Sequence, residues 1–335
     1  MAEQPKNFGF GEDEVMLRDS ARKFLSDHCS SDTLHRMVAS DFNLDRPNEC
    51  LWDQALWQQI VDLGWTAVCV PEAAGGIGMP AVAAIALAEE VGRTAFPSPL
   101  IATLSATFVL NACDSPAATA ALSEIAGGKA TALALTNIDG EWDSAATGVR
   151  VNADGRLDGL AAFVQDARKC AQFIVSAQSD AGVGLYLVSA AAEGLTLTPD
   201  SIIDLTRDQA RLTFEQVDAI ELAAPGTGHA AIDAALPGLL CLVAADMVGA
   251  GEWLLQTTVE YAKTRVQFDR PLGFFQAVKH PLVNVMLQID NAKSLTYNAA
   301  CAIDHDPAEA LRLARMAKSE ASDMAVFSSS RAVQF

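Results

Sequence analysis

The sequence predicts an α+β protein in which helical regions at both ends of the chain flank a central antiparallel β domain. Three observations support this prediction: amphipathic helical periodicity before residue 130, short apolar runs from Thr131 to about Glu221, and long apolar helical stretches from Pro237 onward. The expected domains are residues 1–130, 131–222 and 223–335. With 335 residues, 50% of them hydrophobic, the chain is long enough to bury a large core.

The first third of the chain is expected to be helical. The stretch EDEVMLRDSARKFLSDH places Ala21 and Leu25 on one face with charged residues opposite, and ECLWDQALWQQIVDLGW repeats the pattern with Leu51 and Leu56. VPEAAGGIGMP contains proline and three glycines and is therefore expected to be a loop. AVAAIALAEEVGR resumes as an Ala-rich helix, and a further helix is expected from about Ser98 to Ala112.

The middle of the chain is expected to form about seven antiparallel strands. Runs such as TALAL, QFIVSA, VGLYLVS and ARLTFEQV are separated by the turn sequences DG, ADG and SDAG. Residues 222–236 are expected to be a linker that starts the next helix. Three helices should follow, the first ending near Phe268, the second running from Phe274 to about Ile303, and the third beginning at Pro307.

Composition argues against several classes of function. A formal net charge of -19 disfavours nucleic acid or an anionic membrane as the main partner, because phosphate groups need a basic surface. Asp, Gly and Pro interrupt the apolar runs before the roughly 20 residues of a membrane span, and the N-terminus lacks a signal-peptide core, so we expect a cytoplasmic protein. Seven cysteines without CxxC spacing suit reduced thiols, and no metal site is expected.

Three motifs in a fixed order resemble the acyl-CoA dehydrogenase family. They are VPEAAGGIG after an amphipathic helix, RLTFEQV at the end of the β domain, and YAKTRVQFDRPLGFFQAVKH between two long helices. The resemblance covers essentially the whole chain. It implies an FAD flavoprotein that acts on an acyl-CoA substrate, passes electrons to an electron-transfer flavoprotein or a similar acceptor, and forms a homo- or hetero-tetramer with another chain of this kind.

The resemblance also implies which side chains contact FAD. Arg265, Phe268 and Gln276 would reach across a dimer interface to the diphosphate and adenine side, and an Arg fork pairs with two phosphate oxygens at once. Thr136 and Phe163 would face the isoalloxazine ring. The complete set of expected FAD contacts is Arg265, Phe268, Gln276, Gln334, Thr136 and Phe163.

Ordinary structural roles are the alternatives for these residues. Arg265 could neutralise a helix C-terminus and Gln276 could cap the next helix, whereas Thr136 could end a strand and Phe163 could belong to the core. Two departures from the family pattern stand out. Asp269 occupies a turn position where the family has Gly, and DGEWDS replaces the G-S-D that helps to hold the acyl-CoA.

The catalytic base is not evident in this sequence. In the family a carboxylate removes the α proton of the acyl group, either from a C-terminal loop after a Gly-Gly motif or from a helix position 26 residues before the motif Arg. The helix position corresponds to Leu239, and the sequence ends at SSSRAVQF, before such a loop. We expect either a shortened sequence or a naturally short subunit that completes its helical bundle against a partner.

Asp246, seven residues after Leu239 and so on roughly the same helix face, is a candidate base. Its alternative role is an ion pair with a neighbouring helix or chain.

The expected reaction is α,β-dehydrogenation of an acyl-CoA to the trans-2-enoyl-CoA. One alternative is a catalytically silent FAD-binding subunit of a heteromeric dehydrogenase with two copies of each chain. Another is a flavin monooxygenase or oxidase with the same fold.

Overall fold

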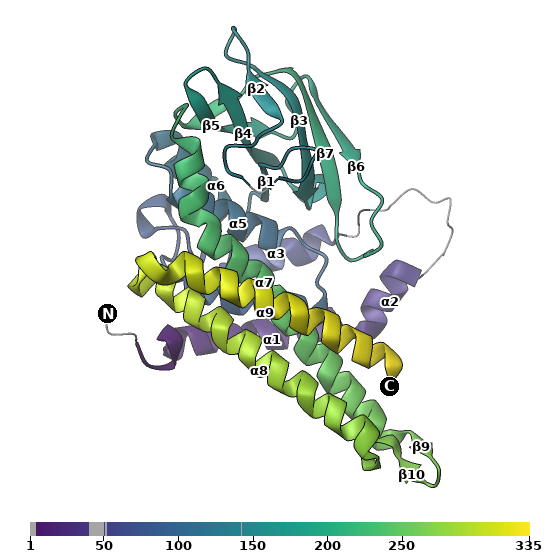
Figure 1. Cartoon of the computed structure of the whole chain (residues 1–335). Coiled ribbons are helices and arrows are strands. Elements are labelled where there is room, and N and C mark those ends of the chain that lie inside the picture. Colours follow the sequence, from purple (N-terminus) through teal and green to yellow (C-terminus); the bar gives the residue numbers. More distant parts are fainter. Residues whose placement is uncertain (1–4, 40–49, 51, 142) are drawn as a thin grey trace. The chain divides into compact units, whose positions relative to one another are not determined.

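The computed structural model describes residues 5–39, 50, 52–141 and 143–335 (Figure 1). The helices are α1 Glu12–His28, α2 Ser31–Ala39, α3 Gln54–Asp62, α4 Ala81–Thr94, α5 Leu100–Asn111, α6 Pro116–Ala126, α7 Gly228–Thr264, α8 Gln276–His305 and α9 Pro307–Gln334. The strands are β1 Thr131–Ala134, β2 Val149–Val151, β3 Leu157–Gln165, β4 Gln172–Ser179, β5 Gly182–Ser189, β6 Leu195–Pro199, β7 Gln209–Val217, β8 Ile220–Ala223, β9 Val266–Gln267 and β10 Arg270–Pro271. This order of helices, strands and helices confirms the predicted fold class. The expected core role of Leu51 lies outside the described residues.

The chain folds into two compact units, each assembled from segments that are distant in sequence. Unit 1 contains Met1–Ser31, Pro80–Phe96 and Pro237–Phe335, and unit 2 contains Asp32–Met79 and Pro97–Leu236. The three-domain division expected from the sequence stays a prediction.

Unit 2 is built on an eight-stranded sheet with the order β6-β7-β3-β2-β4-β5-β8, in which β1 pairs with β4. The prediction of a purely antiparallel domain was wrong. The β1 strand runs parallel to β4, and β2 also meets β4 in parallel. The strand β3 is antiparallel to β2, and the connection from β3 to β4 reverses the direction again. As a result, β4 runs in the same direction as β1 and β2. Alternating apolar residues identify a strand but not the direction of its neighbour, so the sequence could not show this.

One face of this sheet is covered by helices. Ile174, Leu185 and Leu222 of the sheet pack in one buried cluster with α5, α6 and the first turns of α7. The contributing helical residues are Ala106, Val109, Leu110, Ala118, Ala121, Leu122, Ile125, Ala231, Ile232 and Ala235. The first turns of α7 were expected to be a linker, but the helix begins at Gly228 and continues through Pro237. Burial of Ala231, Ile232 and Ala235 against this core stabilises those turns.

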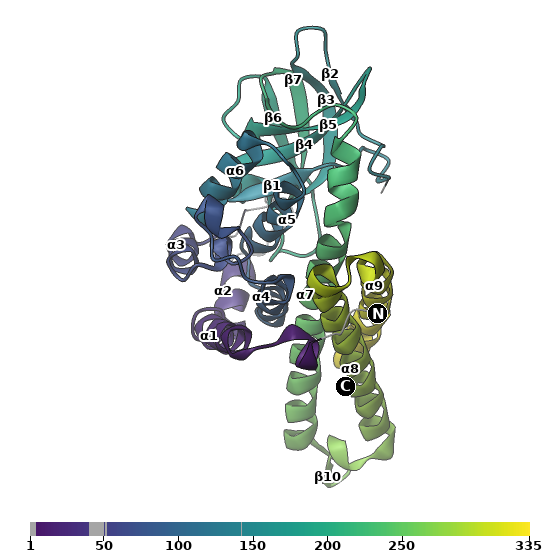
Figure 2. The same cartoon turned by 90° about the vertical axis from the view of Figure 1, so that its left-hand side faces the viewer.

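Unit 1 contains α1, α4, most of α7, and the α8–α9 helical hairpin (Figure 2). The α4 and α7 helices cross in close backbone contact. A Cβ atom placed on Gly92 would lie 2.0 Å from the carbonyl oxygen of Asp246, and one on Gly249 would lie 1.8 Å from that of Glu89. Both crossing points therefore require glycine.

The α7 helix is long and apolar enough to cross a membrane by length and composition. However, 56% of its most apolar stretch is buried inside the protein, as in the core helix of a folded domain. The long apolar segment is therefore accounted for by packing.

Candidate functional site

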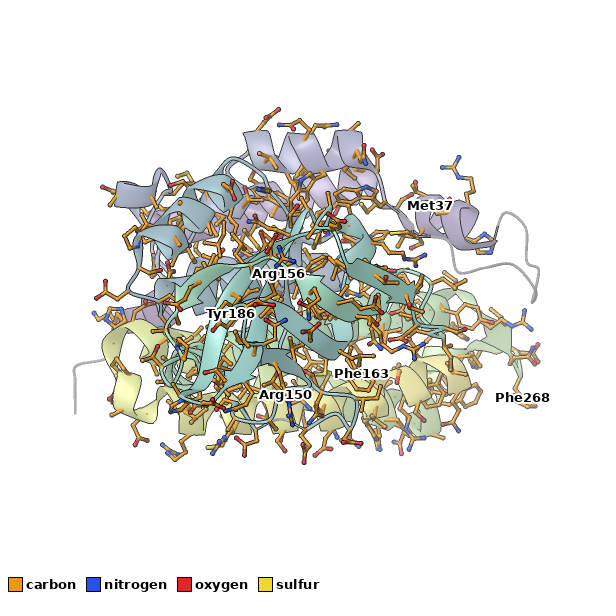
Figure 3. All side chains as sticks on the ribbon, turned by 90° about the horizontal axis from the view of Figure 1, so that it is seen from above. Met37, Arg150, Arg156, Phe163, Tyr186 and Phe268 are labelled. Carbon is orange, nitrogen blue, oxygen red and sulfur yellow. The ribbon has the colours of Figure 1, made fainter. Side chains whose placement is uncertain are left out.

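Thr136 and Phe163 are brought together in unit 2. The backbone N–H of Ala162 donates to the carbonyl of Thr136 at 2.8 Å, so an isolated bridge fixes Thr136 beside the residue that precedes Phe163. Phe163 has a φ of 57° and lies where the register of β3 against β7 shifts. This irregularity leaves the ring 48% exposed on β3 (Figure 3), so Phe163 is not a core residue.

The loop after Thr136 is closed by its own hydrogen bonds. The Asn137 Oδ1 atom accepts the backbone N–H groups of Asp139 and Glu141, and its Nδ2 donates to the Glu141 carboxylate at 2.6 Å. Asp139, Glu141 and Asp143 are exposed. This loop replaces the G-S-D of the family pattern, and it offers carboxylates rather than basic groups to a ligand.

A two-residue β turn presents the predicted diphosphate-binding residues. Phe268 and Asp269 form the turn between β9 and β10 with φ values of 52° and 57°, the geometry of a type I′ hairpin. Asp269, at the turn position where the family has Gly, therefore has a positive φ, and so does Phe268. Arg265 precedes β9, and its carbonyl accepts the N–H of Leu272 at 2.9 Å, which closes the base of the hairpin.

The side chains of this segment are directed to the outside. Phe268 is 85% exposed at the tip (Figure 3), and both Arg265 and Gln276 are exposed. Gln276 is the first residue of α8 and Phe275 is its N-cap, so the expected capping alternative for Gln276 is wrong. The helix-terminus alternative for Arg265 remains compatible with its position directly after α7.

The last two predicted residues lie elsewhere in unit 1. Gln334 is the final residue of α9, and its Oε1 accepts a hydrogen bond from Arg331 at 2.6 Å. Asp246 is half-buried in the middle of α7, where its backbone meets α4 at Gly92. Leu239, at the helix position where the family has a base, is also half-buried.

Unit 1 contains a buried ion cluster that the sequence analysis missed. Glu89 and Glu90 on α4 are completely buried, and cations from three helices surround them. The cluster consists of Arg22, Glu89, Glu90, Arg93, Glu252, Lys293 and Tyr297, so three carboxylates face three cations. The signal was the E-E-x-x-R spacing within an otherwise apolar helix, which places Arg93 one turn after both acids.

The ion cluster links four helices. Arg22 of α1 pairs with Glu90 at 2.7 Å. Lys293 of α8 bridges α4 and α7 by donating to Glu89 at 2.7 Å and to Glu252 at 2.8 Å. Arg93 contacts Glu89, Glu90 and Glu252. Each buried carboxylate is therefore compensated by at least two cations, as burial of charge requires.

The hydroxyl of Tyr297 completes the cluster. It donates to Glu89 Oε2 at 2.7 Å, and burial together with the neighbouring Glu89 charge raises the pKa of Tyr297 well above its ordinary value. Tyr297 is therefore a neutral hydrogen-bond donor across the working pH range.

A cleft of about 310 Å³ opens between α7 and α8 beside this cluster. Its lining combines apolar residues of both helices with three acidic residues and one arginine. The lining residues are Arg93, Glu252, Leu255, Gln256, Val259, Glu260, Met286, Ile289 and Asp290.

Two family models match the chain. "Acyl-CoA dehydrogenase, N-terminal domain" matches residues 11–126, and "Acyl-CoA dehydrogenase, C-terminal domain" matches residues 226–335. Among curated relatives, acyl-CoA dehydrogenase IpdE2 of Mycobacterium tuberculosis is 31% identical over 304 residues, which cover 90% of this chain and 80% of the relative.

Solved structures agree with these matches. A variant of the Tcur3481-Tcur3483 steroid ACAD is 30% identical, with a TM-score of 0.82 over 96% of this chain and 86% of that one. Butyryl-CoA dehydrogenase from Megasphaera elsdenii is 24% identical, with a TM-score of 0.85 over 98% of this chain and 88% of that one, and this likeness shows the fold.

Proposed function

Because the chain belongs to the acyl-CoA dehydrogenase family, we propose that it takes part in FAD-dependent α,β-dehydrogenation of an acyl-CoA thioester to the trans-2-enoyl-CoA. The observation that supports this most directly is the backbone bridge between Thr136 and Ala162, the residue that precedes the exposed Phe163. An aromatic face beside a polar backbone and a hydroxyl is suited to a flat ring with a hydrogen-bonding edge.

Two groups of residues would contact FAD, one at the isoalloxazine ring and one at the diphosphate. Phe163 would cover part of the isoalloxazine ring, and the Thr136 hydroxyl would hydrogen-bond its polar edge. The Arg265 guanidinium would pair with the diphosphate of an FAD held mainly by a neighbouring subunit, with Phe268 and Gln276 beside it. FAD, when bound, would accept the hydride that leaves the β carbon of the acyl group.

The α proton requires a carboxylate within hydrogen-bond reach of the substrate. Asp246 is the candidate on α7, and Gln334 remains a proposed FAD contact at the end of α9. We also propose a cytoplasmic tetramer that passes electrons to an electron-transfer flavoprotein or a similar acceptor.

A second candidate function is an FAD-binding subunit whose partner chain supplies the base. Two observations favour it: the apolar Leu239 at the helix position where the family has a base, and the similarity to the Tcur3481-Tcur3483 steroid ACAD. Under this proposal, activity would appear only after co-expression with a second acyl-CoA dehydrogenase chain that carries a base.

Flavin content of the purified chain is the first test. We expect a visible flavin spectrum after reconstitution with FAD, and oxidation of an acyl-CoA in the presence of an artificial electron acceptor. Absence of flavin from the chain, both alone and with a partner, would contradict both candidate functions. Bound flavin with activity only in the presence of the partner would select the second.

Matched variants test the residues. Arg265→Ala should lower FAD affinity by at least about tenfold, the effect of losing a charge-assisted hydrogen bond, and Arg265→Lys should restore only part of it. Arg270→Ala, which removes an exposed Arg from the same hairpin, is the control and should leave FAD affinity unchanged. Equal losses in both Ala variants would contradict a specific role for Arg265.

A further inference from the structure

One edge of β4 changes its partner strand at Ser176. The β1 strand pairs with this edge as far as Val175, and β2 meets the same edge at Gln178. Ser176 therefore lies between two neighbouring strands, at a point where strand pairing leaves backbone groups without a ladder partner. The side chain is 1% exposed and stands in the otherwise apolar run FIVSA.

Two hydroxyl groups form the hydrogen bonds that strand pairing omits at this point. Ser176 Oγ donates to the carbonyl of Leu135 at 3.2 Å, so the residue after β1 stays attached to β4. Thr147 Oγ1 donates to the carbonyl of Ser176 at 2.6 Å and accepts the N–H of Val149, the first residue of β2, at 3.2 Å. Leu135 and Thr147 lie at opposite ends of the connection between β1 and β2, so both ends are tied to Ser176.

This connection carries a residue that the proposed function assigns to flavin. Thr136 directly follows Leu135, and its own carbonyl accepts the N–H of Ala162 at 2.8 Å. In the part of the chain that the structure describes, the Thr136 hydroxyl has no hydrogen-bond partner, so it is available to a ligand. Gly140 lies against the exposed ring of Phe163 (Figure 3), because a Cβ atom placed on it would be 3.5 Å from Cε2 of that ring.

The backbone on both sides of Thr136 is restrained. Ser176 holds the carbonyl of the preceding residue and Ala162 holds the carbonyl of Thr136 itself, so the peptide groups before and after its Cα atom are both fixed. A side chain on a restrained backbone loses little conformational freedom when it hydrogen-bonds a ligand, and this preorganisation strengthens binding.

We propose that Ser176 is a positioning residue for bound flavin, acting through Thr136 rather than by contact with the cofactor. Its hydroxyl fixes Leu135 and thereby orients the Thr136 hydroxyl toward the polar edge of the isoalloxazine ring. Its carbonyl fixes the other end of the connection through Thr147. This role rests on the proposed FAD-dependent function and adds a residue that makes no contact with FAD.

A double-mutant cycle in FAD affinity tests the route through Thr136. Ser176→Ala and Thr136→Val should each raise the dissociation constant of FAD about three- to tenfold, the effect of one hydrogen bond. The double variant Ser176→Ala/Thr136→Val should stay within about twofold of Thr136→Val alone, because both changes remove the same interaction. Losses that add in the double variant would overturn the route through Thr136.

Matched controls come from the same strand and the same connection. Ser179→Ala removes a hydroxyl that donates to the carbonyl of Gly182 at 3.0 Å, at the end of β4, and should change FAD affinity by less than about twofold. Thr147→Val should weaken FAD binding by about threefold or more, and Thr147→Ser, which keeps the hydroxyl, should restore it. Equal effects of Ser176→Ala and Ser179→Ala would contradict a specific role for Ser176.

The absorption spectrum of bound flavin separates positioning from a purely structural role. At saturating FAD, the absorption maxima of Ser176→Ala should move from those of the wild-type chain to those of Thr136→Val, because the ring edge loses the same donor. Urea unfolding without FAD measures the stability of each variant. A lower unfolding midpoint for Ser176→Ala, with FAD affinity and spectrum unchanged, would make Ser176 a structural residue and refute the proposal.

FAD titration of the wild-type chain distinguishes this failure from failure of the proposed function. If the wild-type chain binds no FAD, alone or with a partner chain, the proposed function and the positioning role both fail. If it binds FAD and Ser176→Ala binds FAD equally well, only the positioning role fails.

Discussion

Replacing Gly249 with Ala is expected to destabilise unit 1 through the crossing of α4 and α7. The new Cβ atom would lie 1.8 Å from the carbonyl oxygen of Glu89, whereas ordinary contact begins at 3.4 Å, so the helices must separate locally by about 1.6 Å. The added methyl group would also lie 2.7 Å from the backbone nitrogen of Arg93. Both neighbours are backbone atoms, which cannot rotate away as a side chain can.

Three effects determine how much Gly249→Ala changes the free energy of unfolding. Overpacking costs about 1–3 kcal/mol. Separation of the helices also weakens the bridge that Lys293 makes to Glu89 at 2.7 Å and to Glu252 at 2.8 Å, and losing one such charged hydrogen bond costs about 1.5–3 kcal/mol. Ala gains about 1 kcal/mol over Gly in helix propensity. We therefore expect Gly249→Ala to lower the free energy of unfolding by about 3 kcal/mol.

Urea unfolding followed by circular dichroism measures this loss as a lower midpoint with an unchanged slope. Gly127→Ala is the matched control, because its Cβ would lie 3.4 Å from the nearest atom and its stability should change by less than about 0.5 kcal/mol. If Gly249→Ala is as stable as the control, α4 and α7 do not cross in close backbone contact.

Three further predictions concern other parts of the molecule. Tyr297→Phe removes the 2.7 Å hydrogen bond to buried Glu89 and should cost about 1.5–3 kcal/mol in urea unfolding, and an unchanged midpoint would show that this bond contributes nothing. Asp304→Ala removes the carboxylate that accepts the N–H of Ala81 at the start of α4, at 2.9 Å, and should cost about 1 kcal/mol, with Asp323→Ala at an exposed position within α9 as the control. Burial raises the pKa of the Cys113 thiol to about 11, so less thiolate exists at pH 8 and its alkylation should be about 100-fold slower than for an ordinary thiol. The alkylation rate of Cys113 should rise from pH 8 to pH 11, and mass spectrometry of the labelled peptide measures it. Rapid alkylation of Cys113 at pH 8 would contradict the raised pKa.

Periodicity in the sequence was sufficient to predict α1, α3, α4, α5, α8 and α9 and the order of helices, strands and helices, whereas α2 and α6 were not predicted. The stretch 12–28 forms α1 as predicted, and Pro307 begins α9. Where prediction failed, the determining contacts were distant in sequence. The parallel pairing of β1 with β4 depends on the path of the chain between them, and the early start of α7 depends on burial of Ala231 and Ile232.

Prediction of the candidate site from the sequence was limited in the same way. The motif comparison selected Thr136 and Phe163, which the structure brings together, but it could not show that Phe163 adopts a positive φ and turns its ring outward. Glu89 and Glu90 were interpreted only as part of an Ala-rich helix, because their compensating cations lie on helices far along the chain.

The ion cluster also constrains the order in which the protein can form during synthesis. Its members come from positions 22, 89–93, 252 and 293–297, so the acids of α4 leave the ribosome long before Lys293 and Tyr297 exist. Unit 2 ends at Leu236 and uses none of these later residues. A nascent chain can therefore complete unit 2 while the charged side chains of α1 and α4 are still solvated. Unit 1 folds last, when α8 and α9 become available to pack with α1 and α4.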